Sequence, residues 1–320
     1  MKAVGVPAVC LLTISVLMSA GCSLRQSEKA AVFEKDELSI GVDEGDDNDV
    51  FWSIADICVN DRGDIFVLDS RKGRIQAYDE NGVHQRNIGK IGEGPGEFTA
   101  PSALLSGKGL IWVLHLRKIS VFNENGDFQY SFPLDFRGLD MAFLGSGELM
   151  ILGPKGENIF HAYSLEGEYL YSFGDFMDMP DEYRQIRGAE LFRTPLKLFV
   201  HGDRIYVMSP YDYEIFVWEN AMLKTRISRK MPGLLKAQFT YEGGGLSAVV
   251  PDYFIEEKQD RLFVFYSKDE KSGLDIWSGE KLEASYVVED VPTTTDRNGK
   301  YYFIELKDYF RVLRKHMEIQ

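Results

Sequence analysis

One β-favouring segment recurs six times along the 320-residue chain, each time after a turn glycine or a charged residue. The copies are Asp64–Asp69, Leu110–His115, Glu148–Gly153, Arg204–Ser209, Arg261–Tyr266 and Lys300–Glu305. Their first residues lie 46, 38, 56, 57 and 39 positions apart, which is typical of propeller blades with four strands each. The recurrence predicts an all-β fold, a six-bladed β-propeller of four-stranded antiparallel blades.

The strand count also predicts how the ring closes. After each copy comes a second apolar strand, then a turn such as Asn81-Gly82 or Asn125-Gly126, then an outer strand. The sixth copy reaches the end of the chain without an outer strand, whereas segment Glu37–Val42 has no blade of its own. We therefore expect this N-terminal strand to close the ring and to cover an exposed edge.

The first 21 residues have the layout of a secretory signal, with basic Lys2 followed by an apolar run over residues 4–20. The run ends in Leu-Met-Ser-Ala-Gly-Cys at 17–22, which resembles a bacterial lipobox. The resemblance implies that Cys22 is lipidated and becomes the first residue of the mature chain. We thus expect a signal peptide at 1–21, a tether at 22–36, and a propeller domain at 37–320. The expected partner is the outer membrane, bound through the lipid anchor, with the periplasmic side favoured over the cell surface.

The stretch Gly63–Pro101, which contains the loop Gly-Glu-Gly-Pro-Gly-Glu-Phe at 92–98, resembles an NHL-type propeller repeat. The whole mature chain resembles the six-bladed propeller lipoproteins of Bacteroidetes-type bacteria, within the TolB-like group. This resemblance implies the fold and export. It implies no single activity, because similar propellers include lyases, lactonases and binding scaffolds.

Composition excludes some partners. The chain carries 50 acidic against 36 basic residues, a net charge of −14. A nucleic-acid partner is not expected, because phosphate binding needs a basic surface. Once Cys10 leaves with the signal and Cys22 carries lipid, only Cys58 remains. Its apolar neighbours predict a buried thiol. No cofactor is expected.

Among the five histidines, none lies at metal-ligand spacing from another on one element, so no metal site is predicted. His115 stands where the first copy has Asp69, at the end of a middle strand. It is a candidate ligand residue, and the alternative is a buried, hydrogen-bonded histidine. The glycine-rich loop at 92–98 is interpreted as a turn between blades with Phe98 filling the gap. The acidic run at 43–49 is interpreted as a solvated linker.

Two long insertions, 174–195 and 230–251, explain the two widest spacings. Insertions of this length are often functional, and both should emerge on one face with the turn 211–213. The predicted ligand-binding residues there are Tyr183, Arg187, Tyr211, Asp212 and Tyr213. An alternative is an apolar cap over one end of the channel.

Three classes of function remain open at this point. The favoured one is a non-enzymatic scaffold at the cell envelope that binds an unknown protein, peptide or glycan. The second is a metal-assisted lyase or lactonase, which needs a carboxylate cluster and a histidine base. The third is a structural subunit of an envelope complex. No catalytic residue is identified.

Overall fold

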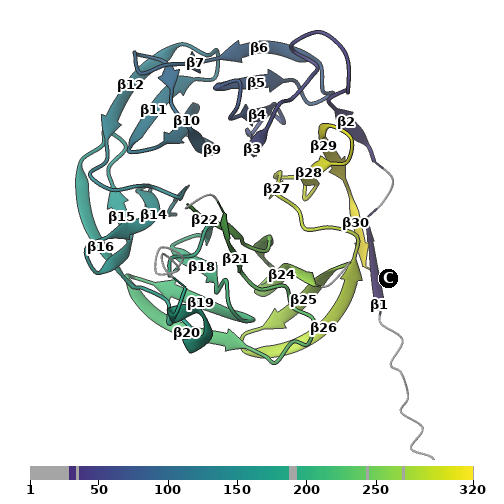
Figure 1. The fold of residues 1–320 in the computed structure, drawn as a ribbon. Coiled ribbons are helices and arrows are strands. Elements are labelled where there is room, and N and C mark those ends of the chain that lie inside the picture. Colours follow the sequence, from purple (N-terminus) through teal and green to yellow (C-terminus); the bar gives the residue numbers. More distant parts are fainter. Residues whose placement is uncertain (1–28, 34–35, 187–192, 243–244, 269–270, 320) are drawn as a thin grey trace, which may run out of the picture.

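The computed structural model describes residues 29–33, 36–186, 193–242, 245–268 and 271–319. Six four-stranded antiparallel blades stand around a ring, as predicted (Figure 1). Blade 1 consists of β3 (Ile54–Val59), β4 (Ile65–Asp69), β5 (Arg74–Tyr78) and β6 (His84–Ile88). Blade 2 consists of β9 (Pro101–Gly107), β10 (Leu110–His115), β11 (Lys118–Asn123) and β12 (Phe128–Pro133). Blade 3 consists of β13 (Asp140–Phe143), β14 (Leu149–Lys155), β15 (Asn158–Tyr163) and β16 (Tyr169–Asp175). Blade 4 consists of β17 (Phe199–His201), β18 (Arg204–Met208), β19 (Glu214–Glu219) and β20 (Met222–Ser228). Blade 5 consists of β23 (Tyr253–Lys258), β24 (Arg261–Lys268), β25 (Lys271–Ser278) and β26 (Lys281–Val288). Blade 6 consists of β27 (Thr294–Thr295), β28 (Tyr301–Leu306), β29 (Phe310–Lys315) and β2 (Leu38–Ile40).

The position of a strand within its blade determines its pattern of burial. All five residues of the middle strand β4 are buried, because both faces of the blade pack on neighbouring blades. The outer strand β6 alternates between partly buried and exposed residues, because one of its faces meets solvent. This difference explains why the middle strands gave the strongest signal in the sequence.

Each of the six blade interfaces has its own hydrophobic cluster, which joins residues of two neighbouring blades. Phe98 lies in the cluster between blades 1 and 2 and is fully buried, beside Phe122 and Ile88. Its ring lies 5.5 Å from the Phe122 ring, measured between centroids. The interpretation that Phe98 fills the gap between blades is confirmed.

The ring closes as the strand count predicts. β2 pairs antiparallel with β29, and Ile40 stands opposite Val312. Ile40 is buried in the cluster that joins blades 6 and 1. Lys300 Nζ lies 2.6 Å from Glu37 Oε2 and reinforces this contact. The N-terminal segment therefore supplies the fourth strand of blade 6.

The chain ends make one feature that the sequence did not predict. β1 (Lys29–Phe33) pairs in parallel with β26, and β30 (Met317–Ile319) pairs with β1, so both extend the sheet of blade 5. Phe33 is 4% exposed, and its ring lies 4.8 Å from that of Phe303. Residues 29–33 fall within the expected tether, but the structure places them in a sheet, because Phe33 fills the interface of blades 5 and 6.

The remaining elements lie in the connections. They are β7 (Lys90–Ile91) with β8 (Glu97–Phe98), the hairpin of β21 (Gln238–Glu242) and β22 (Gly245–Val249), and α1 (Asp181–Arg184). The β21–β22 hairpin lies inside the ring of blades, toward its centre (Figure 1). No helix in the described residues is long and apolar enough to cross a bilayer.

The acidic connection at 43–49 is not simply solvated. Asp47 forms ion pairs with Lys72 at 2.8 Å and Arg74 at 2.5 Å. The hydrogen bond from Lys72 is the main cause that holds the pKa of Asp47 below its ordinary value. The connection is thus fixed onto blade 1, because Lys72 and Arg74 of that blade both bind the carboxylate of Asp47.

Candidate functional site

The ring has two faces, which differ in the connections that they carry. In an antiparallel blade, the turn between the second and third strands lies at the same end as the link to the next blade. Both insertions are links between blades, and Tyr211–Tyr213 joins β18 to β19. These three segments therefore emerge on one side, here called the loop face. The opposite side is called the turn face.

The insertions and the 211–213 turn, which the sequence predicted to share one face, also contact one another. The ring centroid of Tyr183, in α1, lies 4.9 Å from that of Tyr211 and 5.5 Å from that of Phe239. Lys236 Nζ lies 2.7 Å from Asp212 Oδ1, and the Asp212 side chain is 60% exposed. Segments from two different insertions thus meet above blade 4.

Tyr211 and Tyr213 lie beneath this surface instead of lining it. They are 1% and 2% exposed. The Tyr213 hydroxyl accepts a hydrogen bond from Trp277 Nε1 at 3.0 Å. Burial raises the pKa of Tyr211 to about 12 and that of Tyr213 well above its ordinary value. The binding role predicted for these two rings is corrected to a packing role, because the loops that surround them exclude solvent.

His115 is also corrected. It is 4% exposed, its Nε2 lies 2.9 Å from Ser120 Oγ, and its ring meets the edge of Phe98 at 5.6 Å. Burial lowers its pKa to about 4, so the ring is neutral at pH 7. It packs between blades 1 and 2, as the alternative interpretation had it. Asp69, at the aligned position, is likewise fully buried and binds the amide of Trp52 at 2.8 Å.

Of the other predicted residues, Tyr183 is half-buried in α1, where it covers Tyr211. Arg187 and Cys22 lie outside the residues that the structure describes. Asp212 is therefore the one predicted residue on the described loop face that is largely exposed.

The loop face holds a pocket of about 800 Å³ over blade 5, here called the basic pocket. It lies beside the second insertion, which contributes Leu235. The lining residues are Arg229, Leu235, Tyr266, Lys268, Lys271, Ser272, Gly273, Ser285, Tyr286 and Val287. This size and this mixture of apolar walls with a few convergent polar groups are typical of ligand sites.

A buried polar network forms the floor of the basic pocket. Asp275 has no exposed surface, and Arg229 Nε lies 3.1 Å from its Oδ2. The same guanidinium donates to Ser285 Oγ at 3.1 Å and to Tyr266 Oη at 3.2 Å. Burial raises the pKa of Asp275 above its ordinary value, and Arg229 opposes this shift. The network fixes one guanidinium at the pocket wall, with 26% of its side chain exposed.

Two lysines stand at the rim. Lys268 ends β24, Lys271 begins β25, and the two residues are direct cross-strand partners. Like charges in this position repel, so a bound anion would relieve the repulsion. The turn residues between them, Asp269 and Glu270, lie outside the described part of the chain.

Gly273 leaves space for the Tyr266 side chain at the floor of the basic pocket. A Cβ atom at this position would lie 2.3 Å from Tyr266 Cζ and 2.5 Å from its hydroxyl oxygen. Tyr266 therefore reaches Asp275, where its hydroxyl donates to Oδ1 at 3.3 Å, only because residue 273 has no side chain.

Asp56 and Asp140 also have raised pKa values, but their carboxylates hold neighbouring blades together. Asp56 accepts the amide of Leu104 at 2.8 Å, and Asp140 accepts that of Leu198 at 2.9 Å. Each bond joins the start of an inner strand to the next blade. Burial raises the pKa of Asp56 to about 6 and that of Asp140 to about 7.

These network residues were missed in the sequence. Arg229 and Asp275 lie on different blades, so no local spacing connects them. The sequence does contain a signal for aspartates such as Asp56 and Asp140. An aspartate precedes an apolar residue in Asp56-Ile57, Asp140-Met141 and Asp290-Val291. In each case the carboxylate accepts the amide of the following residue.

No set of three or more His, Cys, Asp or Glu side chains within the described residues is arranged to hold a metal ion. The basic pocket has groups that suit non-covalent anion binding: one guanidinium held by hydrogen bonds, two rim lysines, hydroxyl groups and an aromatic ring.

Residues 44–243 match the model of the family DUF5128, described as a 6-bladed beta-propeller. The chain belongs to this family. No match was found among curated proteins.

Several solved structures share the fold of this DUF5128 propeller. A Bacteroides fragilis protein assigned as exported is 13% identical, with a TM-score of 0.58 over 88% of this chain and 94% of its own. A DUF4221 member from Bacteroides vulgatus is 12% identical, with a TM-score of 0.58 over 92% and 99%. The virginiamycin B lyase of Staphylococcus aureus is 12% identical, with a TM-score of 0.55 over 91% and 96%. At such identities the likeness shows the overall fold alone, and the number of blades comes from the family model and from the sheets of this chain.

Proposed function

We propose that this chain is an exported, lipid-anchored propeller of the NHL/TolB-like type that binds a carboxylate-bearing ligand without catalysis, as a scaffold at the cell envelope. The observation that carries the proposal is the basic pocket. In a chain of net charge −14, it gathers Arg229, Lys268 and Lys271 around a cavity of about 800 Å³.

The pocket suits a carboxylate for reasons of geometry. Arg229 is held in place by Asp275, Tyr266 and Ser285, so it loses little freedom when a ligand binds. Lys268 and Lys271 are close across the strand pair and would share one anionic group. Tyr286 and Leu235 supply apolar surface for the rest of the ligand.

The anchor and the sheet together suggest an orientation. Only residues 23–28 separate Cys22 from β1, which lies on the outer edge of blade 5. A stretch of seven Cα–Cα steps spans at most about 25 Å. Lipidation of Cys22 would thus hold this edge of the ring near the outer membrane, on the periplasmic side. Cys22→Ser should release the protein from the membrane fraction, and unchanged membrane association would remove the lipid anchor from the proposal.

Binding is tested with acidic probes of two kinds. A tri-glutamate peptide and a galacturonate trimer are titrated by calorimetry against the mature protein, with triglutamine and a neutral galactose trimer as controls. Lys268→Gln with Lys271→Gln should weaken binding of an acidic probe by about tenfold or more, because two charge-assisted contacts are lost. The matched control, Lys224→Gln with Lys281→Gln, removes the same charge from the turn face.

The two probes distinguish a peptide ligand from a glycan ligand. Failure of both to bind, or equal binding by the Lys268/Lys271 and Lys224/Lys281 variants, would contradict the proposed function.

A further inference from the structure

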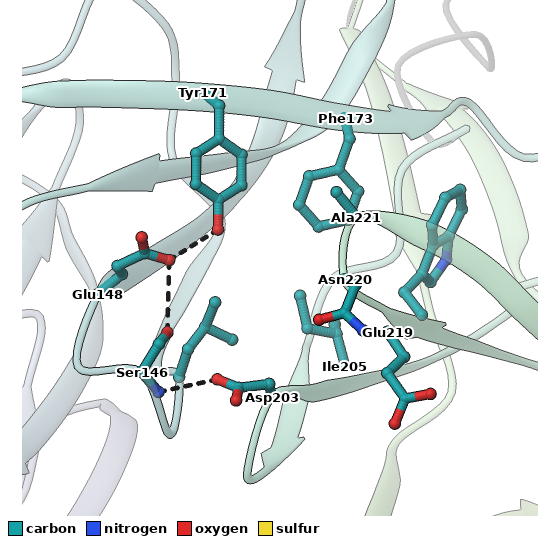
Figure 2. Close-up of a pocket in the computed structure, with 11 residues that line it drawn as sticks. Ser146, Glu148, Tyr171, Phe173, Asp203, Ile205, Glu219, Asn220 and Ala221 are labelled. Carbon is teal, nitrogen blue, oxygen red and sulfur yellow. Dashed lines mark hydrogen bonds between the residues drawn. The ribbon is translucent and has the colours of Figure 1, made fainter.

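A second cavity, of about 400 Å³, opens on the turn face between blades 3 and 4 (Figure 2). It is called the turn-face cavity here. Its walls come from the first turns of both blades, from β16, and from the turn that joins β19 to β20. The lining residues are Leu144, Ser146, Glu148, Tyr171, Phe173, Asp203, Ile205, Trp218, Glu219, Asn220 and Ala221. None of these residues belongs to the insertions or to the basic pocket.

Three aromatic rings form one wall. Tyr171 and Phe173 are two apart on β16, so they project on the same side, with ring centroids 6.1 Å apart and nearly parallel planes. Figure 2 shows both rings pointing from their strand toward the open space of the cavity. Trp218 lies 5.7 Å from Phe173 and continues the aromatic surface into blade 4.

Two carboxylates face this wall. Glu148 Oε2 accepts a hydrogen bond from the Tyr171 hydroxyl at 2.7 Å, and Asp203 Oδ1 accepts one from the Ser146 amide at 2.8 Å (Figure 2). Within the described residues, neither carboxylate forms an ion pair with a lysine or arginine. Glu219 differs, because Arg204 binds it at 3.0 Å. Among the described residues, the cavity therefore has two carboxylates without a cation partner.

The walls are held in place before any ligand arrives. The Gly145 amide donates to the Gly202 carbonyl at 2.6 Å, which fixes the first turn of blade 3 against that of blade 4. A Cβ at Gly145 would lie 3.0 Å from the Gly202 backbone, so a side chain here would push the two turns slightly apart. Burial raises the pKa of Tyr171 to about 12, and its hydroxyl stays a donor to Glu148 at neutral pH.

We propose that the turn-face cavity binds an organic ammonium group. Aromatic faces attract a cation through their negative electrostatic potential, and quaternary ammonium ligands are recognised by such rings. Glu148 and Asp203 supply the compensating charge, and the shelter of the cavity strengthens both attractions. A neutral sugar would use the aromatic wall but would leave the two carboxylates without a countercharge.

The test titrates the mature protein with choline, with acetyl-lysine-amide (free side-chain ammonium), and with neutral glucose. Calorimetry and the intrinsic tryptophan fluorescence of the protein report binding. Choline, acetyl-lysine-amide or both should bind saturably. The comparison of their affinities distinguishes recognition of a quaternary ammonium from recognition of a primary one. Glu148→Gln with Asp203→Asn should weaken binding by about tenfold or more, while circular dichroism stays unchanged. The control Glu166→Gln with Glu168→Gln removes two exposed charges from the neighbouring turn and should leave binding as it is.

Three results would overturn the proposal: no saturable binding of either cation, equal binding by the Glu148/Asp203 variant, or glucose binding that exceeds cation binding. A variant that fails to fold is replaced by Trp218→Leu, which keeps both carboxylates and should still lose the cation. None of these outcomes depends on the basic pocket, so the two proposals fail separately.

Discussion

The interface between blades 1 and 2 and the interface between blades 4 and 5 are built from the same strands but differ in their contents. The first is filled by apolar side chains around Phe98, with His115 neutral at its edge. Against the second lies a buried polar network, in which Arg229 pairs with Asp275 and donates to the Tyr266 hydroxyl. Both interfaces have an apolar core, but only the second of these two has a buried ion pair at its edge, and this ion pair is the basis of the proposed ligand site.

The largest expected effect tests the sealed interface. Phe98→Ala should lower the free energy of unfolding by about 3–5 kcal/mol, because it leaves a cavity between two blades. Chemical denaturation measures the change, and Ile91→Ala, at a position that is 65% exposed in the same loop, is the matched control. A denaturation midpoint equal to that of the control would mean that Phe98 does not hold these blades together.

The next effect tests the polar interface. Arg229→Met keeps the unbranched stem of the side chain but leaves Asp275 buried without its cation, at an expected cost of about 2–3 kcal/mol. Arg226→Met, at a position where the arginine side chain is 52% exposed, should cost less than about 0.5 kcal/mol. Equal stability of the two variants would show that the network contributes nothing to the fold, and the contrast between the interfaces would be lost.

The smallest expected effect concerns Asp140, whose carboxylate joins two blades, in contrast to Asp275 beneath the basic pocket. The folded-state pKa of Asp140, about 7, lies above its ordinary value of 3.8, so the unfolded chain ionises more easily. The stabilising contribution is complete below about pH 4 and is lost as the pH rises through about 7. Between about pH 6 and 8, wild type should therefore lose about 1–2 kcal/mol relative to Asp140→Asn.

Thermal melts at several pH values measure this loss. Binding of acidic probes should be the same for Asp140→Asn and wild type, since Asp140 clamps blades 3 and 4 outside the basic pocket. A stability difference that does not change with pH would contradict the assignment of Asp140 to a buried clamp.

The sequence predicted the ring well because its signals are local. Apolar runs such as Ile65–Leu68 are buried on both faces, and turn glycines separate the strands, so the number of blades could be counted. The closing strand followed from the same count, with Ile40 as its buried residue. By contrast, β1 holds only five residues and pairs with strands some 250 to 290 positions away, so no local pattern revealed it.

The candidate site was harder to predict, because its chemistry joins distant segments. Arg229 follows blade 4, whereas Asp275 lies in the third strand of blade 5. Position in the repeat placed His115, Tyr211 and Tyr213 near strand ends, but it could not show that neighbouring blades and loops bury them. Exposure is decided by packing between segments, and this packing is visible only in three dimensions.

The central claim is that the loop face over blade 5 is where the ligand binds. Hydrogen exchange measured with and without the tighter acidic probe tests it most directly, because it maps contacts along the backbone. The account predicts slower exchange at residues 271–275 and 285–288, with no change at 61–63 on the turn face. Protection at other blades, or no protection under saturating probe, would contradict it.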